Sequence, residues 1–456
     1  YAQYDWRFAP RVTFNLGGRY EYQKLPGAQL PNPSAAPIPN TGVTFNQATS
    51  QLPNDKNNFG PRFGFAVDVT GDGKTSVRGG YGLYYGRTIN STIYNAVQNT
   101  GAAGGQFLVS LQPANAAAPV FPNVLTSAPA GSGAIQYFAP NFGNSMIHQT
   151  DLIFEREVMR NMTVSASYLF SLGGKLPTFL DRNLNLPIDN QTFTVSGGPF
   201  AGQTFTIPVF RGPRPNTSYS QLTEISSSVK SEYNALVLQA NRRFSGGLQF
   251  LASYTLSKAV DDSQTSQTFT TANVPFNVFD PKAGRGRSRF DRRHKFVLSA
   301  VYAPRLKADN KFATALIDGW SIAPIFQFYT GLPYDGLVSG SLSGPGITTP
   351  AGSLNGAGSS SNRLPLLKRN AFTGPGVKNF DLRLSRRFYI KEKMNVEFLG
   401  EAFNIFNRTQ FTGVNTTMYT LNGTTLTYNT VFGTLTEAGG TLYRERQIQL
   451  GLRFQF

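Results

Sequence analysis

Residues 446–456 read RQIQLGLRFQF, and apolar and polar side chains alternate along this stretch without a fault. Successive side chains of a β-strand point to opposite faces, so the stretch predicts a strand with one apolar and one polar face. Soluble β-sandwiches also contain such strands, so the fold is decided by how often the pattern recurs and over what length. The apolar face consists of Ile448, Leu450, Leu452, Phe454 and Phe456.

The same alternation recurs in long segments at residues 11–22, 161–171, 247–257 and 394–402. A tilted strand needs roughly 9 to 11 residues to cross a bilayer, whereas strands of globular proteins average about half that length. The length of these segments therefore favours an all-β fold that is an antiparallel transmembrane β-barrel over a soluble sandwich.

Short and long connections alternate between the expected strands, as in outer-membrane barrels, which have short periplasmic turns and long extracellular loops. The short links lie at Ala9-Pro10, Gly71-Asp72-Gly73, Arg160-Asn161, Ser245-Gly246-Gly247 and Lys391-Glu392, with a longer one near 305–316. The long loops lie near 23–57, 88–145, 174–230, 261–291, 332–378 and 408–440. A soluble domain rarely contains six loops of such length.

The pattern predicts about thirteen strands, although bacterial single-chain barrels have an even number. The chain also opens without a Met or a signal-peptide pattern. We therefore expect residues 1–456 to be the C-terminal part of one barrel domain, with strands and a signal peptide missing upstream. The expected number of strands could change by one or two, because the 174–230 loop contains strand-like pieces at 191–195 and 203–209. The strands are expected near 1–8, 11–22, 59–69, 76–87, 147–157, 161–172, 232–244, 247–260, 293–303, 318–331, 379–389, 393–407 and 443–456.

Composition agrees with an all-β protein and argues against several function classes. The chain holds 46 Gly, 28 Pro, 37 Phe and 20 Tyr but no Cys and two His, which leaves little scope for a metal centre or a thiol nucleophile. The formal charge of +17 is spread along strands and loops, so we do not expect nucleic-acid binding. We expect that the protein binds no cofactor and is not an enzyme, since the sequence shows no nucleophile turn and no His-based relay.

Several segments resemble the C-terminal barrel of the TonB-dependent receptors, in particular the Oar-like branch. This resemblance implies a barrel of about 22 strands that is filled by an N-terminal plug and takes up its ligand with energy supplied through TonB. The chain shows neither plug nor TonB-contacting box, so both are expected upstream. The segments are Tyr1 to Tyr22, Pro61 to Arg87, Tyr233 to Asp262, Phe290 to Val301, Gly319 to Pro333 and Glu401 to Asn407 (EAFNIFN).

The terminal residues Leu450, Leu452, Phe454 and Phe456 resemble the signal that the outer-membrane barrel-assembly machinery reads. Its physical basis is an edge strand that pairs with the edge of the machine. The alternative is a plain terminal strand.

The motif that begins at Asp68 is similar to the start of a calcium loop, but its twelfth position is Gly79 instead of the required Glu, so a tight turn explains it better.

Two groups of charged residues are candidates for binding. The first, Arg285, Arg287, Arg289, Arg292 and Arg293, suits an anion such as a phosphate or acidic sugar. We favour the alternative that these arginines pair with nearby carboxylates or with lipopolysaccharide phosphates. The second group lies on the polar faces of two neighbouring strands, where it would face the lumen and either line a substrate path or contact the plug. Its members are Arg383, Arg387, Glu397 and Glu401.

The leading hypothesis is an integral protein of the Gram-negative outer membrane, the barrel of a receptor for an unidentified large or scarce ligand. Siderophore, glycan and peptide all stay open as ligands. Expected partners are outer-membrane lipid and lipopolysaccharide, the barrel-assembly machinery, TonB through the missing N-terminal part, and the ligand. A passive porin and an adhesin that acts through its long loops are the alternatives.

Overall fold

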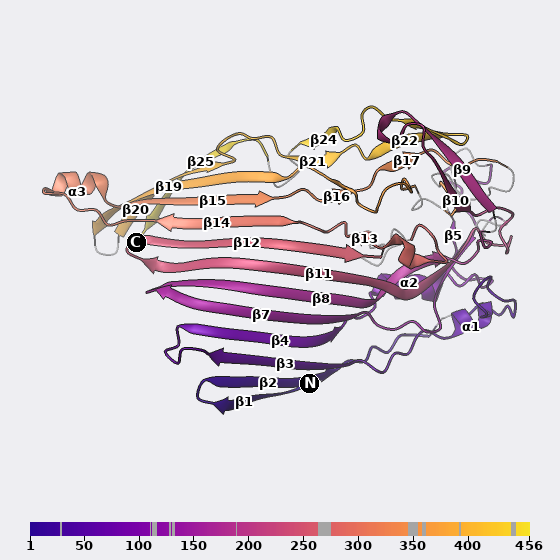
Figure 1. The fold of residues 1–456 in the computed structure, drawn as a ribbon, viewed down its shortest axis with the longest axis horizontal. Helices are drawn as coiled ribbons and strands as arrows, with labels where there is room; N and C mark the ends of the chain where they lie inside the picture. The colour runs from indigo at the N-terminus through magenta and orange to yellow at the C-terminus, as the bar shows by residue number, and fades with distance from the viewer. Residues whose placement is uncertain are drawn as a thin grey trace.

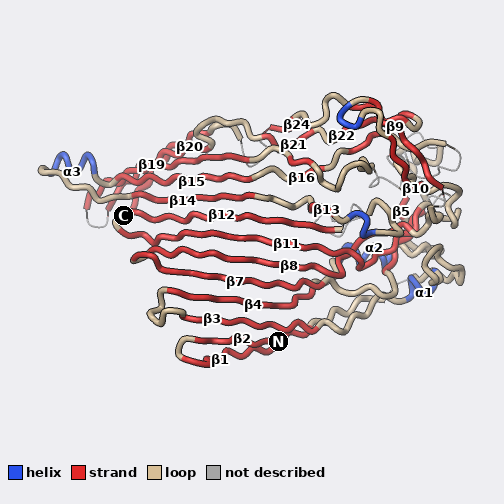
Figure 2. The backbone as a smooth tube through the Cα atoms, viewed as in Figure 1, coloured by secondary structure: helices blue, strands red, loops and turns tan. Residues whose placement is uncertain are grey.

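A computed structural model describes residues 1–27, 30–109, 111, 116–126, 129, 133–187, 189–262, 275–344, 354–357, 362–391, 394–438 and 444–456. Figure 1 shows one large sheet whose strands run side by side, with the long connections gathered at one end. Figure 2 shows that strand and loop make up nearly the whole of it, with few helices. Within these residues, no helix has the length and apolar character of a membrane span.

The main path of this sheet follows the order of the chain, and each strand pairs antiparallel with the next. Every strand expected from the sequence overlaps one strand of this path, which confirms the predicted antiparallel β architecture. The strands are β1 (Ala2–Ala9), β2 (Val12–Tyr20), β3 (Phe59–Asp68), β4 (Thr75–Tyr85), β7 (Met146–Met159), β8 (Met162–Asp181), β11 (Gln221–Ser245), β12 (Leu248–Asp261), β14 (His294–Tyr302), β15 (Trp320–Tyr329), β19 (Val377–Lys391), β20 (Met394–Phe403) and β25 (Gln447–Gln455).

β8 and β11 run well beyond their expected ends into the loop region. Their pairing continues past register shifts near Val229 and reaches Thr223 opposite Asp181. In this extension Phe179, Leu180 and Ile225 are buried, because further elements cover it on both sides. A strand buried on both faces loses the alternation of apolar and polar residues, which is why the sequence pattern stops short.

The short connections and the C-terminal residue lie together at the end of the sheet opposite the loops (Figure 1). The turns after β7 and β11 are made by residues 160–161 and 246–247. The connection after β14 differs, because it folds into helix α3 (Lys311–Ile317). In the turn after β19, residues 392–393 lie outside the described residues.

At the loop end, segments from three long connections form a separate five-stranded sheet in the order β10-β9-β23-β22-β17. We call this sheet and the side chains packed beneath it the loop sheet. Its strands β9 and β10 coincide with the strand-like pieces seen in the sequence, and they lie outside the main path. The strands are β9 (Asp189–Ser196), β10 (Thr204–Val209), β17 (Leu337–Ser339), β22 (Thr417–Asn422) and β23 (Thr425–Tyr428).

Smaller elements complete the loop end. β6 (Gly133–Phe138) pairs parallel with the outer part of β11 and antiparallel with β5 (Leu108–Val109). Two-stranded pairs form between β16 (Pro333–Tyr334) and β18 (Phe372–Thr373), and between β21 (Phe411–Val414) and β24 (Leu435–Ala438). The remaining elements are α1 (Phe45–Ser50), α2 (Asn90–Gln98), η1 (Gly198–Phe200), η2 (Pro281–Gly284) and β13 (Gly286–Arg287).

The buried apolar clusters lie at the loop end and leave one face of the main sheet uncovered. Leu450 and Leu452 are 82% and 51% exposed, and β20 is the pairing partner of their strand. Cross-strand register places apolar residues of distant strands on the same uncovered face, such as Phe14, Phe65, Tyr168, Leu236, Leu384 and Leu450. Within the described part of the chain no layer packs on this apolar face, which suits contact with lipid. The path begins at β1 and ends at β25, and the described residues of these two strands do not pair with each other.

Gly247 makes a close approach that only glycine permits. Its φ is +79°, and an added Cβ would lie 2.8 Å from the Cα of Pro304. We expect Gly247→Ala to lower the free energy of unfolding by at least about 2 kcal/mol, from the left-handed backbone and the steric overlap together. Gly73→Ala is the control, because its φ is +73° but nothing lies within 4 Å. Urea unfolding followed by circular dichroism measures both, and equal losses would contradict the close approach.

Candidate functional site

The loop sheet has a core of its own. Phe193, Val195, Val338, Tyr419 and Leu426 are at most 2% exposed although they come from three connections far apart in the chain. The Tyr419 hydroxyl donates to the carbonyl of Gly197 at 3.2 Å. Full burial of such a side chain contributes about 1.5–3 kcal/mol, so the three connections form one ordered layer.

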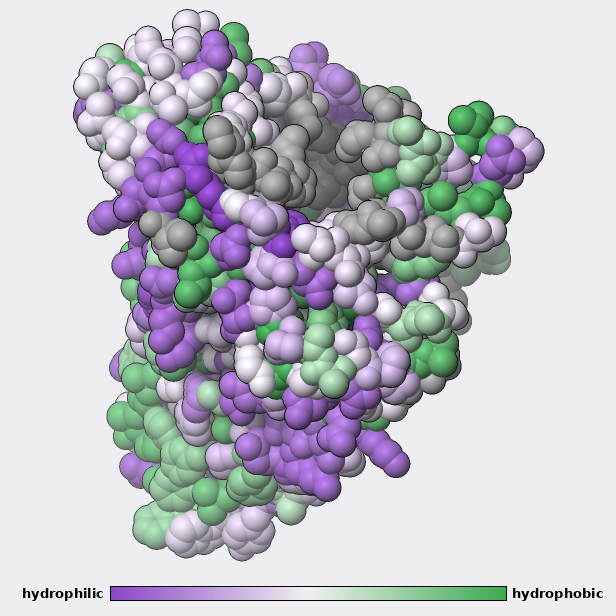
Figure 3. All heavy atoms as spheres, turned by 90° about the vertical axis from the view of Figure 1, so that its right-hand side faces the viewer, coloured by the Kyte–Doolittle hydropathy of each residue, from purple (hydrophilic) through white to green (hydrophobic). Residues whose placement is uncertain are grey.

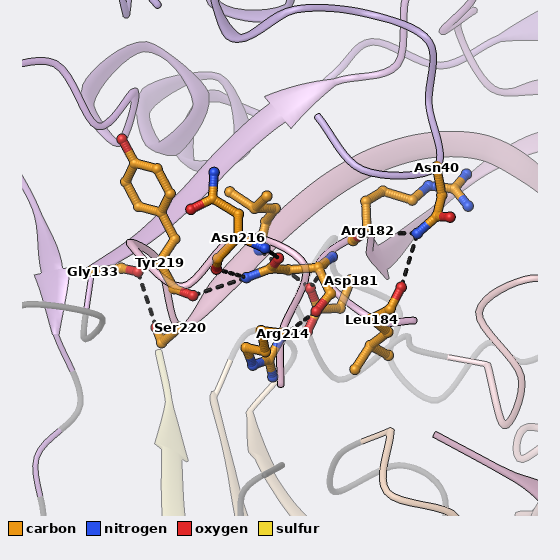
Figure 4. Close-up of polar contacts among 11 residues, drawn as sticks. Asn40, Gly133, Asp181, Arg182, Leu184, Arg214, Asn216, Tyr219 and Ser220 are labelled. Atoms are coloured by element: carbon orange, nitrogen blue, oxygen red, sulfur yellow. Dashed lines mark hydrogen bonds and ion pairs between the residues drawn. The ribbon is translucent and has the colours of Figure 1, made fainter. Parts of the chain in front are cut away.

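A buried ion pair lies where β8 ends and joins the 174–230 connection to β11 (Figure 4). The Arg214 Nη1 lies 2.7 Å from Asp181 Oδ2, and the two side chains are 13% and 6% exposed. The other carboxylate oxygen, Oδ1, accepts hydrogen bonds from the backbone N–H groups of Asn183 at 2.9 Å and Leu222 at 3.2 Å. A buried charge needs such partners to offset its desolvation, so Asp181 fixes the returning loop to β11.

Amide side chains extend this network to neighbouring connections. Asn183 Nδ2 donates to the carbonyls of Asn216 at 2.9 Å and Tyr219 at 2.8 Å. Asn40, from the 23–57 connection, donates to the carbonyl of Leu184 at 2.8 Å (Figure 4). Arg182 pairs with Glu224 at 2.7 Å. The 23–57 and 174–230 connections are therefore held together by specific polar contacts.

Tyr137 on β6 lies beside this network and is 1% exposed. Burial raises the pKa of its phenol far above the ordinary value, and the nearby carboxylate of Glu224 raises the pKa further. The hydroxyl therefore stays protonated at neutral pH and adds no charge to the buried layer.

A second network of ion pairs lies where β12 ends, and it contains two of the arginines from the predicted basic group. Arg285 pairs with Asp262 at 3.0 Å and with Glu232 at 3.3 Å. Arg287 pairs with Asp291 at 2.6 Å. Their positive charges are thus offset by carboxylates.

The other three arginines of the group lie apart from those ion pairs. Arg289 is exposed. The Arg292 guanidinium lies 5.4 Å from the ring centre of Tyr329 and donates to the carbonyl of Thr330 at 3.4 Å. Arg293 is half-buried, and its carbonyl accepts from Ser257 N at 2.9 Å. Contact of these residues with an anion or with lipopolysaccharide stays a prediction.

Sequence reasoning missed the partner of Asp261, the buried Arg369. The two side chains form an ion pair and are 2% and 7% exposed. Arg369 also donates to the Asp261 carbonyl at 3.1 Å. The adjacent Asn370 donates to the carbonyl of Arg287 at 2.7 Å, which ties the 332–378 connection to the basic stretch. The sequence around either residue does not predict such a pair, because the partners lie about a hundred positions apart.

The four charged residues of the second predicted group come together on the polar face of the sheet. Arg383 lies opposite Glu401 and Arg387 opposite Glu397 in the register of β19 and β20. The paired atoms are 3.4 Å and 3.1 Å apart. This face is opposite to the one that carries Leu450. Whether it faces a lumen stays a prediction.

The same polar face carries a hollow of about 250 Å³ over β1 to β4 and β7. Gly17, Gly64 and Gly80 form part of its lining, and the absence of their side chains opens the space. The Arg62 guanidinium lies over the Tyr84 ring at 4.7 Å. The hollow thus offers a cation, amides and a carboxylate to a polar ligand, and its polar lining residues include Gln3, Asn15, Arg62, Tyr84, Gln149 and Asp151.

Viewed from the loop end, hydrophilic residues cover much of the middle of the surface, and hydrophobic residues gather at the lower left edge (Figure 3). Among the residues with described coordinates, no three His, Cys, Asp or Glu side chains gather as a metal site requires.

The predicted assembly residues Leu450, Leu452 and Phe454 lie on β25, and Phe456 follows it; all four are exposed. Their recognition by the assembly machinery stays a prediction.

A family model described as an outer membrane beta barrel domain matches residues 1–449. No curated protein matches the sequence. Among solved structures, the outer membrane transporter YddB from Escherichia coli is similar, with a TM-score of 0.51 at 10% identity over 98% of this chain and 43% of YddB. This likeness concerns the fold alone.

Two receptors of Pseudomonas aeruginosa also match. A mutant of the ferric enterobactin receptor PfeA gives a TM-score of 0.47 at 9% identity over 99% of this chain and 44% of PfeA. The pyoverdine-bound FpvA gives 0.45 at 11% identity over 100% of this chain and 37% of FpvA. The chain spans less than half the length of each of these three proteins.

Proposed function

Since this chain belongs to the family of outer membrane β-barrel domains and lies in the outer membrane, we propose that it forms the wall and outer loops of a receptor. The receptor takes up a large or scarce ligand with energy supplied through TonB. The observation that carries the proposal is the loop sheet, in which three connections share one buried core. A surface that is ordered before binding loses less conformational entropy when a ligand binds.

The polar face of the sheet is suited to line the path of a polar ligand or to contact a plug. The ion pairs Arg383–Glu401 and Arg387–Glu397 and the hollow at Arg62 lie on this face. In this proposal such groups either line the ligand path or contact the plug. The plug and the TonB-contacting segment belong to the whole protein in this proposal. We propose a transport role and no catalytic role.

Uptake by cells that produce the whole protein tests the proposal. A ferric siderophore, an oligosaccharide and a peptide are supplied in turn, with TonB present or deleted. We expect one class to accumulate in the cells only when TonB is present, while binding at the cell surface persists without it.

Two other results would overturn the proposal and identify an alternative. A passive porin would admit small sugars into liposomes at the same rate with or without an energy source. An adhesin would bind surfaces or partner cells through the loop sheet and accumulate none of the three ligand classes.

A further inference from the structure

The connection between β14 and β15 is a folded element at the turn end of the sheet (Figure 1). It spans residues 303–319, whereas the turn after β7 spans only residues 160–161. Asn310 begins α3 by accepting from the Ala313 N–H at 2.6 Å. The Thr314 hydroxyl accepts from the N–H of Ala308 at 2.9 Å and donates to its carbonyl at 3.2 Å. These local bonds give the connection a defined conformation.

The ordered connection presents large apolar side chains outward. Phe312 is 77% exposed and Leu316 is 52% exposed, and their spacing of four places them on one side of the helix. Leu306 and Ile317 are 41% and 39% exposed. An exposed apolar patch on an ordered element is typical of a surface that contacts a membrane or another protein.

This patch continues directly into the uncovered apolar face of the main sheet. Trp320, the first residue of β15, donates its indole N–H to the carbonyl of Leu316 at 3.2 Å. Across the register Trp320 lies opposite Arg386, and Ile322 lies opposite Leu384. The apolar surface therefore runs from α3 along the strands that contact lipid.

Basic groups lie at the margin of the patch. Arg305 and Lys307 are exposed on both sides of Leu306. The Arg386 guanidinium lies over the rings of Trp320 at 5.0 Å and Phe388 at 4.3 Å. Of the nearby carboxylates, Asp318 accepts from the Leu306 N–H at 3.0 Å, and Asp309 is exposed. Aromatic rings and cations beside an apolar surface are typical of the level of lipid phosphates.

We propose that the connection 303–319 lies in the inner leaflet of the outer membrane and binds anionic phospholipid. Phe312, Leu316 and Ile317 insert among the acyl chains. Arg305 and Lys307 contact the phosphate groups, as in interfacial helices that combine an apolar face with basic residues. The element fixes the height of the β14–β15 hairpin relative to the inner leaflet.

Tryptophan fluorescence in bilayers of dibrominated lipid tests this proposal. The chain has two tryptophans, so a Trp6→Phe, Trp320→Phe background is silent, and Phe312→Trp then reports on α3. The matched control is Lys74→Trp, on the exposed turn between β3 and β4 at the same end of the sheet. Circular dichroism confirms that each variant keeps its β-structure.

We expect the Phe312→Trp emission to be shifted to shorter wavelength and quenched more by bromines near the headgroup than by bromines near the bilayer centre. Interfacial helices insert only about 5–10 Å. The Lys74→Trp emission should be that of an indole in water and stay unquenched. The proposal is overturned if both variants emit alike, or if the Phe312→Trp emission is shielded but not quenched, which would indicate a protein partner.

The charge contribution is tested with phosphatidylglycerol added to phosphatidylcholine. Phe312→Trp should be quenched more in the mixed bilayer, and the added substitutions Arg305→Gln and Lys307→Gln should abolish that increase. An increase that survives both substitutions would contradict the assignment of these residues to the phosphates.

Discussion

Replacing Asp181 with Ala is expected to destabilise the attachment of the 182–220 segment to β11 by about 3–5 kcal/mol, the usual cost of removing one partner of a buried ion pair. Arg214 would remain buried without a counter-charge. The N–H groups of Asn183 and Leu222 would lose their acceptor. Asp181→Asn should cost less, because its amide oxygen still accepts from these N–H groups.

Hydrogen exchange of the 182–220 segment measures this effect. The matched control is Asp189→Ala in the same connection, whose carboxylate pairs with Arg211 at 2.6 Å but is 51% exposed. Exposed pairs contribute about 0–1 kcal/mol, so the control should change exchange little. Equal exchange in the two variants would show that the network of Asp181 does not hold the 182–220 segment against β11.

Leu450→Lys is expected to lower the free energy of unfolding in bilayers by about 2–4 kcal/mol, the cost of a cation near the midplane on the lipid face of a barrel. Leu450 lies in the middle part of β25 and points away from the polar face. Gln449→Lys is the control, because Gln449 lies opposite Glu401 on the polar face. Urea titrations in lipid vesicles compare the two, and equal losses would contradict a one-sided contact with lipid.

The main sheet could be predicted from the sequence because each strand carries its own signal. β25 and β2 alternate along their lengths, and Gly246-Gly247 marks a tight turn with positive φ at both positions. The order of the strands then follows because strands that are consecutive in the chain usually lie side by side. Information of this kind is local, so it can be read along the chain.

The loop sheet could not be predicted, because its pairing joins residues far apart. β23 pairs with β9 at Thr425 and Thr194, and neither sequence position indicates the other. The same holds for Asp261 and Arg369. Within the basic group, the pairing of Arg287 with Asp291 was open to prediction, since the two lie four positions apart. The helix α3 is short, and alternation of apolar and polar residues indicates strands, not a helix.

Spin labels on single cysteines along β25 test the central inference, contact of the apolar row with lipid, most directly. The chain has no native Cys, so labels at 448, 449, 450, 452 and 453 report each position alone in bilayers. We expect high accessibility to oxygen, which dissolves in lipid, at 448, 450 and 452, and low accessibility at 449 and 453. Uniform accessibility, or shielding of the apolar row from oxygen, would contradict a transmembrane barrel wall.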